Sequence, residues 1–141
     1  MAKHINTSIQ INAELETVWN ILTDFGAYPE WNPFIKSIEG EVAEGKRITA
    51  KIGGMTFKPE VLVFEEKKEL KWLGNLWTRG LFDGEHRFLL TKNKDGVLFE
   101  QSEKFSGLLV PLFAKSLDKD TVKGFNEMNG RLKDRCEAFS V

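Results

Sequence analysis

Two side chains in this sequence, His86 and Glu103, are the best suited to move a proton or to hold a polar group. Each lies in a run of alternating apolar residues, and the polar sequence at 93–96 separates the two runs. If the runs pair as strands with Lys92 opposite Val97, then His86 lies opposite Glu103. A carboxylate there orients and charges the imidazole, which then serves as a polar anchor or as a general acid and base. The alternative is a structural pair whose members satisfy each other.

The pairing register of these two strands follows from their apolar pattern. The register that joins His86 to Glu103 also sets Leu90 opposite Phe99 and Phe88 opposite Gln101. A three-residue loop with Gly96 in a bulge would set the same apolar residues against polar ones. Because a slip of one residue turns a whole apolar set outward, we predict the first register.

Gln101 and Asn129 are the next polar candidates. Gln101 falls on the predicted inner face beside His86, and Asn129 interrupts the apolar stripe of a predicted C-terminal helix. A buried amide destabilises the fold unless it finds a hydrogen-bond partner. Each side chain is therefore predicted to contact a ligand or to bond to a strand or water, and both alternatives stay open.

The elements that position these residues can be predicted from hydrophobic periodicity. Strict alternation from Ile5 to Ile11 predicts a first strand, and apolar residues at helical spacing then predict an amphipathic helix over 13–23. From Ile35 to Gly107, short alternating runs between turn sequences predict six more strands. One of these predicted strands contains Phe57, Val61 and Val63.

The last third of the chain returns to helical spacing. Its apolar stripe predicts one long helix over 110–139, with a break near Asp118. Two glycines, Gly124 and Gly130, weaken that helix intrinsically by about 1 kcal/mol each relative to alanine. Packing along the apolar stripe must therefore hold the helix in place.

The segment Tyr28–Phe34 joins the first helix to the strands and contains three aromatic residues and two prolines. Each proline lacks a backbone N–H and restricts the residue before it, so we predict a stiff, irregular elbow. We expect Trp31 and Phe34 to point from this elbow toward the mouth of a cavity. Trp72 and Trp77 are predicted to line that cavity or its mouth.

Composition limits the classes of function. A chain of 141 residues with 41% hydrophobic and 29% charged residues suits one globular domain over residues 1–141. A net charge of −1 favours neither nucleic acid nor an anionic membrane. The sequence has one cysteine, no signal-peptide pattern and no apolar run long enough for membrane insertion, which indicates a cytoplasmic protein.

Motifs for cofactors and common active sites are absent from the sequence. No histidine–cysteine spacing predicts a metal site, and Gly53-Gly54 lacks the lysine and helix of a phosphate-binding loop. No Gly-x-Ser-x-Gly elbow predicts a hydrolase. We therefore predict no metal and no cofactor.

Four segments together resemble the SRPBCC superfamily of START-like proteins, and most closely its polyketide cyclase/dehydrase-like branch. They are Tyr28–Phe34, Phe82–Phe88, Gln101–Leu109 and Phe125–Lys133. The resemblance implies an α+β helix-grip fold, in which a curved antiparallel sheet of about seven strands wraps around a long C-terminal helix. It also implies two short helices after the first strand and a hydrophobic cavity between sheet and helix. Members of the superfamily include carriers, cyclases, hydroxylase partners and chaperone activators.

The favoured prediction is a protein that binds a small, mainly hydrophobic ligand (a lipid, a polyketide or an aromatic compound) in this cavity. Two alternatives stay open: a cyclase or dehydratase in which His86 and Glu103 transfer protons, without a firm catalytic assignment, and a protein-interaction or chaperone-activator-like module. A homodimer or a client protein is the partner to consider besides the ligand. The predicted ligand-binding residues are Trp31, Phe34, Phe57, Trp72, His86, Phe88, Phe99, Gln101, Glu103, Phe105, Phe113, Phe125, Met128 and Asn129.

Overall fold

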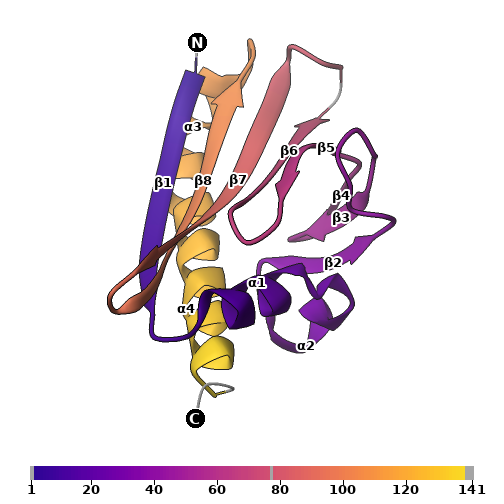
Figure 1. Cartoon of the computed structure of the whole chain (residues 1–141). Helices are drawn as coiled ribbons and strands as arrows, with labels where there is room; N and C mark the ends of the chain where they lie inside the picture. Colours follow the sequence, from indigo (N-terminus) through magenta and orange to yellow (C-terminus); the bar gives the residue numbers. More distant parts are fainter. Residues whose placement is uncertain (1, 77, 139–141) are drawn as a thin grey trace.

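A five-stranded antiparallel sheet is the framework of the fold. The computed structural model describes residues 2–76 and 78–138. The strand order in this sheet is β1-β8-β7-β6-β5. The strands are β1 (Ala2–Ile11), β5 (Glu60–Glu65), β6 (Glu69–Leu76), β7 (Phe82–Asn93) and β8 (Gly96–Ser106). The strand β7 is at the centre of this sheet and β8 lies beside it (Figure 1). The inward side chains of both strands are buried along most of their length.

A second sheet of three short strands lies beside the first. It contains β2 (Ile35–Glu39), β3 (Thr49–Ile52) and β4 (Met55–Phe57), in that order. The prediction of a single strand containing Phe57 and Val63 is wrong, because β4 ends before Pro59 and β5 begins after it in the other sheet. Proline has no N–H to donate to a ladder, and it separates strands at this point. The fold therefore has eight described strands in two sheets, where about seven in one sheet were expected.

The segment between β1 and β2 contains two short helices, α1 (Leu15–Thr23) and α2 (Tyr28–Trp31), with a 3₁₀ turn between them. The predicted irregular elbow is thus partly helical. Pro29 lies in the first turn of α2, where a missing N–H leaves no intrahelical hydrogen bond unmade. Asn32 then ends the helix and accepts hydrogen bonds from the N–H groups of Phe34 and Ile35, which turns the chain into β2.

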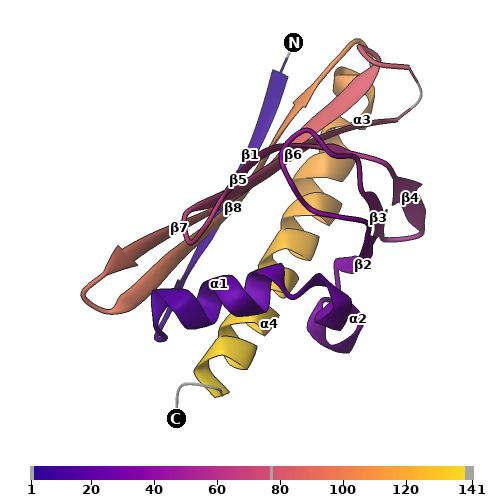
Figure 2. The same cartoon turned by 45° about the vertical axis from the view of Figure 1, so that its right-hand side comes forward.

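The C-terminal helix is continuous from Val110 to Ala138 in three parts. The short α-helix α3 (Val110–Ser116) is followed by a π-helical segment (Leu117–Thr121) and then by α4 (Val122–Ala138). The helix has no break near Asp118, where one was predicted; it changes there to a π-helical segment and continues. The predicted last residue, 139, lies outside the described part of the chain. The helix runs along one face of the five-stranded sheet, and α1 lies beside α4 (Figure 1 and Figure 2).

The hydrophobic core between sheet and helix has two parts. The larger surrounds the α1 end of the sheet and includes Trp19, Phe88 and Phe99. The smaller lies at the opposite end, around Phe105 and Phe125. This α+β arrangement confirms the predicted fold class. Among the described residues, no helix is long and apolar enough to cross a membrane.

Candidate functional site

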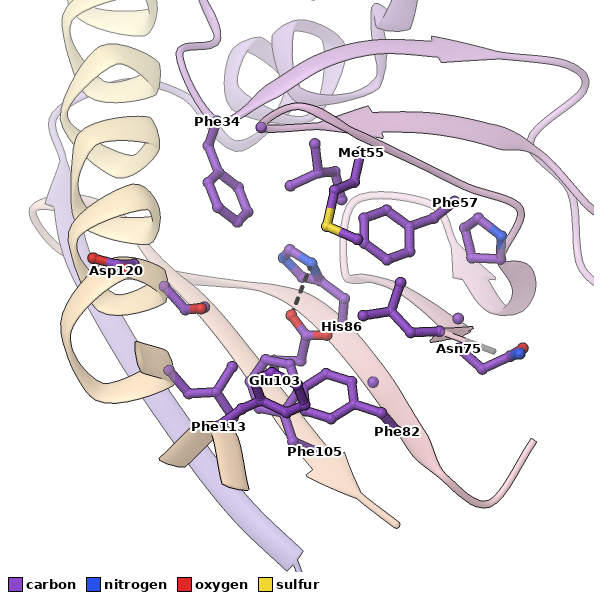
Figure 3. Close-up of a pocket in the computed structure, with 18 of the residues that line it drawn as sticks. Phe34, Met55, Phe57, Asn75, Phe82, His86, Glu103, Phe105, Phe113 and Asp120 are labelled. Atoms are coloured by element: carbon purple, nitrogen blue, oxygen red, sulfur yellow. Dashed lines mark ion pairs between the residues drawn. The ribbon is translucent and has the colours of Figure 1, made fainter. Parts of the chain in front are cut away.

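A cavity of about 730 Å³ opens between the three-stranded sheet, the inner face of β6–β8 and the first half of the C-terminal helix. Figure 3 shows side chains from all of these elements pointing into it. The lining is mainly apolar. It consists of Phe34, Ile52, Gly53, Gly54, Met55, Phe57, Pro59, Trp72, Gly74, Asn75, Leu76, Phe82, Gly84, His86, Glu103, Phe105, Phe113, Ser116, Leu117, Asp120 and Thr121.

His86 and Glu103 form the polar end of the cavity (Figure 3). The predicted register is confirmed, since β7 and β8 pair with His86 opposite Glu103. The imidazole Nδ1 lies 3.5 Å from Glu103 Oε1. Gly84 makes room for the carboxyl group, because a Cβ at this position would lie 2.2 Å from Glu103 Oε2. An alanine at this position would therefore force the Glu103 carboxyl group to move.

A chain of hydrogen bonds leads from His86 away from the cavity. His86 Nε2 lies 2.9 Å from Gln101 Oε1, and Gln101 Nε2 donates to Asn129 Oδ1 over 2.7 Å. Asn129 Nδ2 donates in turn to the hydroxyl oxygen of Thr7 over 2.9 Å. The Thr7 hydroxyl donates to the backbone carbonyl of Gln101 over 2.8 Å. The chain thus ties the imidazole to β1, β8 and α4.

The direction of this chain fixes the tautomer of the histidine. A backbone carbonyl can only accept a hydrogen bond, so the Thr7 hydroxyl proton must point to the Gln101 carbonyl. The Thr7 oxygen must then accept from the Asn129 amide. Asn129 and then Gln101 must each present a carbonyl oxygen to the next donor. Gln101 Oε1 consequently accepts from His86, which places the imidazole proton on Nε2. Nδ1 is left as a lone-pair acceptor facing Glu103 and the cavity.

Burial shifts the protonation of both members of the pair toward their neutral forms. Desolvation lowers the pKa of His86 to about 4, and the hydrogen bond to Gln101 opposes that shift with a smaller effect. Desolvation raises the pKa of Glu103 to about 8. At neutral pH the pair is therefore an imidazole and a carboxylic acid. Burial therefore disfavours the charged imidazole expected from the sequence, because a separated charge pair is costly in this apolar site and the contact is long.

Half of the predicted ligand-binding residues line the cavity. They are Phe34, Phe57, Trp72, His86, Glu103, Phe105 and Phe113. The other seven belong to the packed interior and do not line it. These are Trp31, Phe88, Phe99, Gln101, Phe125, Met128 and Asn129.

Three of these interior residues have clear structural roles. Trp31 packs edge-on against Tyr28, with ring centroids 5.2 Å apart, and does not point into the cavity mouth as expected. For Gln101 and Asn129, the alternative of hydrogen bonds within the fold is the one the structure supports. Trp77, which was also expected near the mouth, lies outside the described residues.

Several lining residues were missed by sequence reasoning. Phe82 had a usable signal, since it continues the alternation of β7 that begins with Phe88 and His86. Asp120 and Thr121 lie in the π-helical segment, and the predicted irregularity near that point was not connected with the cavity. π-helical turns often occur at functional sites. Met55 follows a glycine turn whose fold-back over the cavity cannot be predicted from local pattern.

Two carboxyl side chains lie on the cavity wall. Glu103 and Asp120 are among the lining residues named above, which include no lysine or arginine. Within residues 2–76 and 78–138, no three His, Cys, Asp or Glu side chains gather in a metal-binding arrangement. The arrangement offers an apolar chamber with one neutral hydrogen-bonding pair at its polar end.

Comparison with known proteins extends over the whole chain. A family model described as "Polyketide cyclase / dehydrase and lipid transport" matches residues 2–137. No curated protein sequence matches the chain.

Solved structures share the fold at low sequence identity. A hypothetical protein from Helicobacter pylori superposes with a TM-score of 0.81 at 19% identity, over 99% of this chain and 88% of that one. A START superfamily protein from Mycobacterium smegmatis gives 0.68 at 23% identity, over 93% and 97%. The di-domain ARO/CYC StfQ of the steffimycin biosynthetic pathway gives 0.79 at 9% identity, over 99% of this chain and 52% of that one. At these identities the likeness shows the fold alone.

Proposed function

The chain belongs to the polyketide cyclase/dehydrase and lipid transport family, and from that premise we propose that it binds a small hydrophobic ligand in the cavity beside His86 and Glu103. One observation carries the proposal: a mainly apolar cavity of about 730 Å³ contains the His86–Glu103 pair in its wall. Cavities of roughly 300–1,000 Å³ are typical of small-molecule sites. The family resemblance predicted from the sequence is confirmed by the match to the family model.

The neutral pair supports a ligand with one polar group at its buried end. His86 Nδ1 accepts a hydrogen bond, and the protonated Glu103 carboxyl both donates and accepts. Because Nδ1 and Oε1 lie 3.5 Å apart, a ligand hydroxyl between them would improve on their direct contact. Phe34 and Phe105 on opposite sides of the pair would enclose the apolar body of the ligand.

A cavity-filling variant tests the proposal. Thr121 lines the cavity from the π-helical segment, so Thr121→Trp places an indole inside it. Thr91→Trp is the matched control, because Thr91 lies exposed on β7 outside the cavity. We expect the neutral dye Nile red to fluoresce on wild type and on Thr91→Trp, with binding weakened at least about tenfold in Thr121→Trp. Equal binding to all three proteins contradicts the proposal.

A second function, acid–base catalysis of a cyclase or dehydratase type, is favoured by one specific observation. The pair combines an unprotonated Nδ1, which is a general base, with a carboxyl group whose pKa of about 8 makes it a general acid near neutral pH. The two groups face the same apolar cavity. Such a site can remove a proton from one atom of a bound substrate and return one to another.

Proton abstraction can be tested with nitrobenzisoxazole, an apolar probe for a buried base. The base removes the ring C–H proton, the N–O bond breaks, and a coloured cyanophenolate forms. If the second function holds, wild type accelerates this reaction and His86→Phe abolishes the acceleration. An unchanged rate in His86→Phe contradicts a role of Nδ1 as the base.

A further inference from the structure

The cavity has a marked charge preference in its wall. Its ionisable lining residues are Glu103, Asp120 and His86, and the lining contains no lysine or arginine. Two basic side chains outside the lining are paired with other carboxylates: Lys3 lies 2.7 Å from Asp118, and Arg79 lies 3.9 Å from Asp83. A ligand carboxylate or phosphate would therefore enter a site that has acidic groups and no basic partner for it.

Aromatic rings surround the acidic end. In Figure 3 Phe82, Phe105 and Phe113 lie on one side of Glu103, while Phe34 and Phe57 project from the other wall. Trp72 packs beside His86, with ring centroids 5.4 Å apart. Ring faces attract cations, and the attraction is strongest where water is excluded. A carboxyl group enclosed by aromatic rings is the arrangement that recognises an organic cation.

We propose that the ligand is a hydrophobic amine, bound as its ammonium ion with Glu103 as the counter-charge and the surrounding rings as its apolar and cation–π contacts. This inference rests on the proposed function, since it names the polar end of the same ligand. Nδ1 of His86, 3.5 Å from Oε1, is placed to accept a second hydrogen bond from the ammonium group.

Binding of an ammonium ion changes the protonation of Glu103. The free carboxyl is neutral at neutral pH because burial raises its pKa to about 8, and an adjacent cation favours the carboxylate. The carboxylic acid and the ammonium ion then give an ion pair and one released proton. The groups that face Glu103 are His86 across β7, Ile5 across β1 and the helix segment with Asp120. The Glu103 side chain is 15% exposed, whereas that of His86 is 2% exposed, so Glu103 is the member of the pair that can release a proton to solvent on binding.

Three probes with one skeleton test the inference. Naphthylmethylamine, naphthylmethanol and naphthoate carry an ammonium, a hydroxyl and a carboxylate on the same ring system. Isothermal titration calorimetry at pH 7, repeated in two buffers of different ionisation enthalpy, measures affinity and the number of protons released. The proteins compared are wild type, Glu103→Gln and the control Glu100→Gln, whose residue lies on β8 outside the cavity lining. Thermal unfolding of each protein confirms that it is folded.

The expected order of affinity for wild type is amine, then alcohol, then carboxylate. The amine should release close to one proton at pH 7, whereas the alcohol should release none. In Glu103→Gln the amine should bind at least about tenfold more weakly, with alcohol binding within about threefold of wild type. Glu100→Gln on the same strand should retain the amine affinity, because Glu100 does not line the cavity.

The outcomes separate this inference from the proposed function. Alcohol binding as tight as amine binding overturns the amine inference and leaves a hydrophobic site in place. Tightest binding of naphthoate also overturns it, since an anion would then be preferred. Saturable binding of none of the three contradicts the proposed function, and the amine inference fails with it.

Discussion

Nδ1 of His86 and Oε1 of Glu103 lie 3.5 Å apart on paired strands, and burial moves their pKa values in opposite directions. The histidine becomes harder to protonate and the glutamate harder to ionise. The pair is therefore uncharged over a range of pH in which an exposed histidine and glutamate would attract each other as ions. This gives the cavity a polar end without a permanent charge.

The first prediction is a loss of stability on going from pH 6.5 to pH 8. The folded protein keeps the Glu103 proton up to about 8, whereas an unfolded glutamate has lost it above 4.5, so rising pH favours unfolding. His86 has the opposite effect on stability. Its folded-state pKa is lowered from 6.5 to about 4, so falling pH through this range favours the unfolded protein, in which the histidine is protonated. Between 4.5 and 6.5 the two effects oppose each other, and above 6.5 the Glu103 effect remains. Its size is at most about 2 kcal/mol, since one pKa unit corresponds to about 1.4 kcal/mol.

Denaturant titration of Glu103→Gln at both pH values measures this effect. Glutamine does not titrate, so the variant should lose less stability than wild type between pH 6.5 and 8. Glu100→Gln on the same strand is the control, because Glu100 does not line the cavity. The account is wrong if Glu103→Gln and wild type have parallel pH profiles.

The second prediction concerns the tautomer of His86. The hydrogen-bond chain requires the proton on Nε2, so long-range proton–nitrogen NMR should show a protonated Nε2 and an unprotonated Nδ1 at neutral pH. The protein has two histidines, and the exposed His4 provides an internal reference for the NMR signals. The signals of His86 should remain those of a neutral ring at pH 5, because burial lowers its pKa to about 4. A doubly protonated His86 at that pH would contradict its assignment.

The third prediction is that Asn129 stabilises the fold through Gln101. Asn129→Leu keeps the side-chain size but leaves the buried Gln101 amide with a long 3.5 Å contact to the Phe125 carbonyl. An unsatisfied buried donor typically lowers the free energy of unfolding by about 1–3 kcal/mol. Asn126→Leu, on an exposed position of the same helix, should change it by no more than about 0.5 kcal/mol. Equal effects of the two substitutions on the free energy of unfolding would contradict a structural role for the Asn129–Gln101 hydrogen bond.

The fourth prediction compares two glycines of α4. A Cβ at Gly130 meets no atom within 4 Å, so Gly130→Ala should raise the free energy of unfolding by about 0.5–1 kcal/mol. A Cβ at Gly124 would lie 2.3 Å from the ring of Phe34, which must then move. Gly124→Ala should therefore be less stable than Gly130→Ala and should alter Nile red binding, because Phe34 lines the cavity. Equal stabilisation by both substitutions would contradict this packing.

Sequence pattern was sufficient for the parts of the fold that repeat regularly. The alternation around His86 and Glu103 indicated the register of β7 and β8, because a slip of one residue would have exposed Phe88 or Phe99. The helical stripe of α4 was equally clear, whereas the break predicted near Asp118 is a π-helical segment within a continuous helix.

The extent of the cavity was harder to predict, because it depends on how separate elements approach one another. Phe88 lies beside His86 on the inner face of the sheet, and Phe125 packs on His86 from α4. Both looked suited to a ligand, but their neighbours fill the space around them. Which inward residues border the cavity depends on the β3–β4 hairpin with Met55 and on the helix turn with Asp120. Neither position is encoded in local periodicity.

The most direct test of the central claim is native mass spectrometry of freshly purified protein. If the cavity beside His86 and Glu103 holds a small hydrophobic ligand, wild type and Thr91→Trp should carry a bound small molecule that denaturation releases. Thr121→Trp should carry none, since its indole occupies the same space. A wild-type protein without bound mass that also fails to bind Nile red would contradict the account, as would equal ligand occupancy in Thr121→Trp.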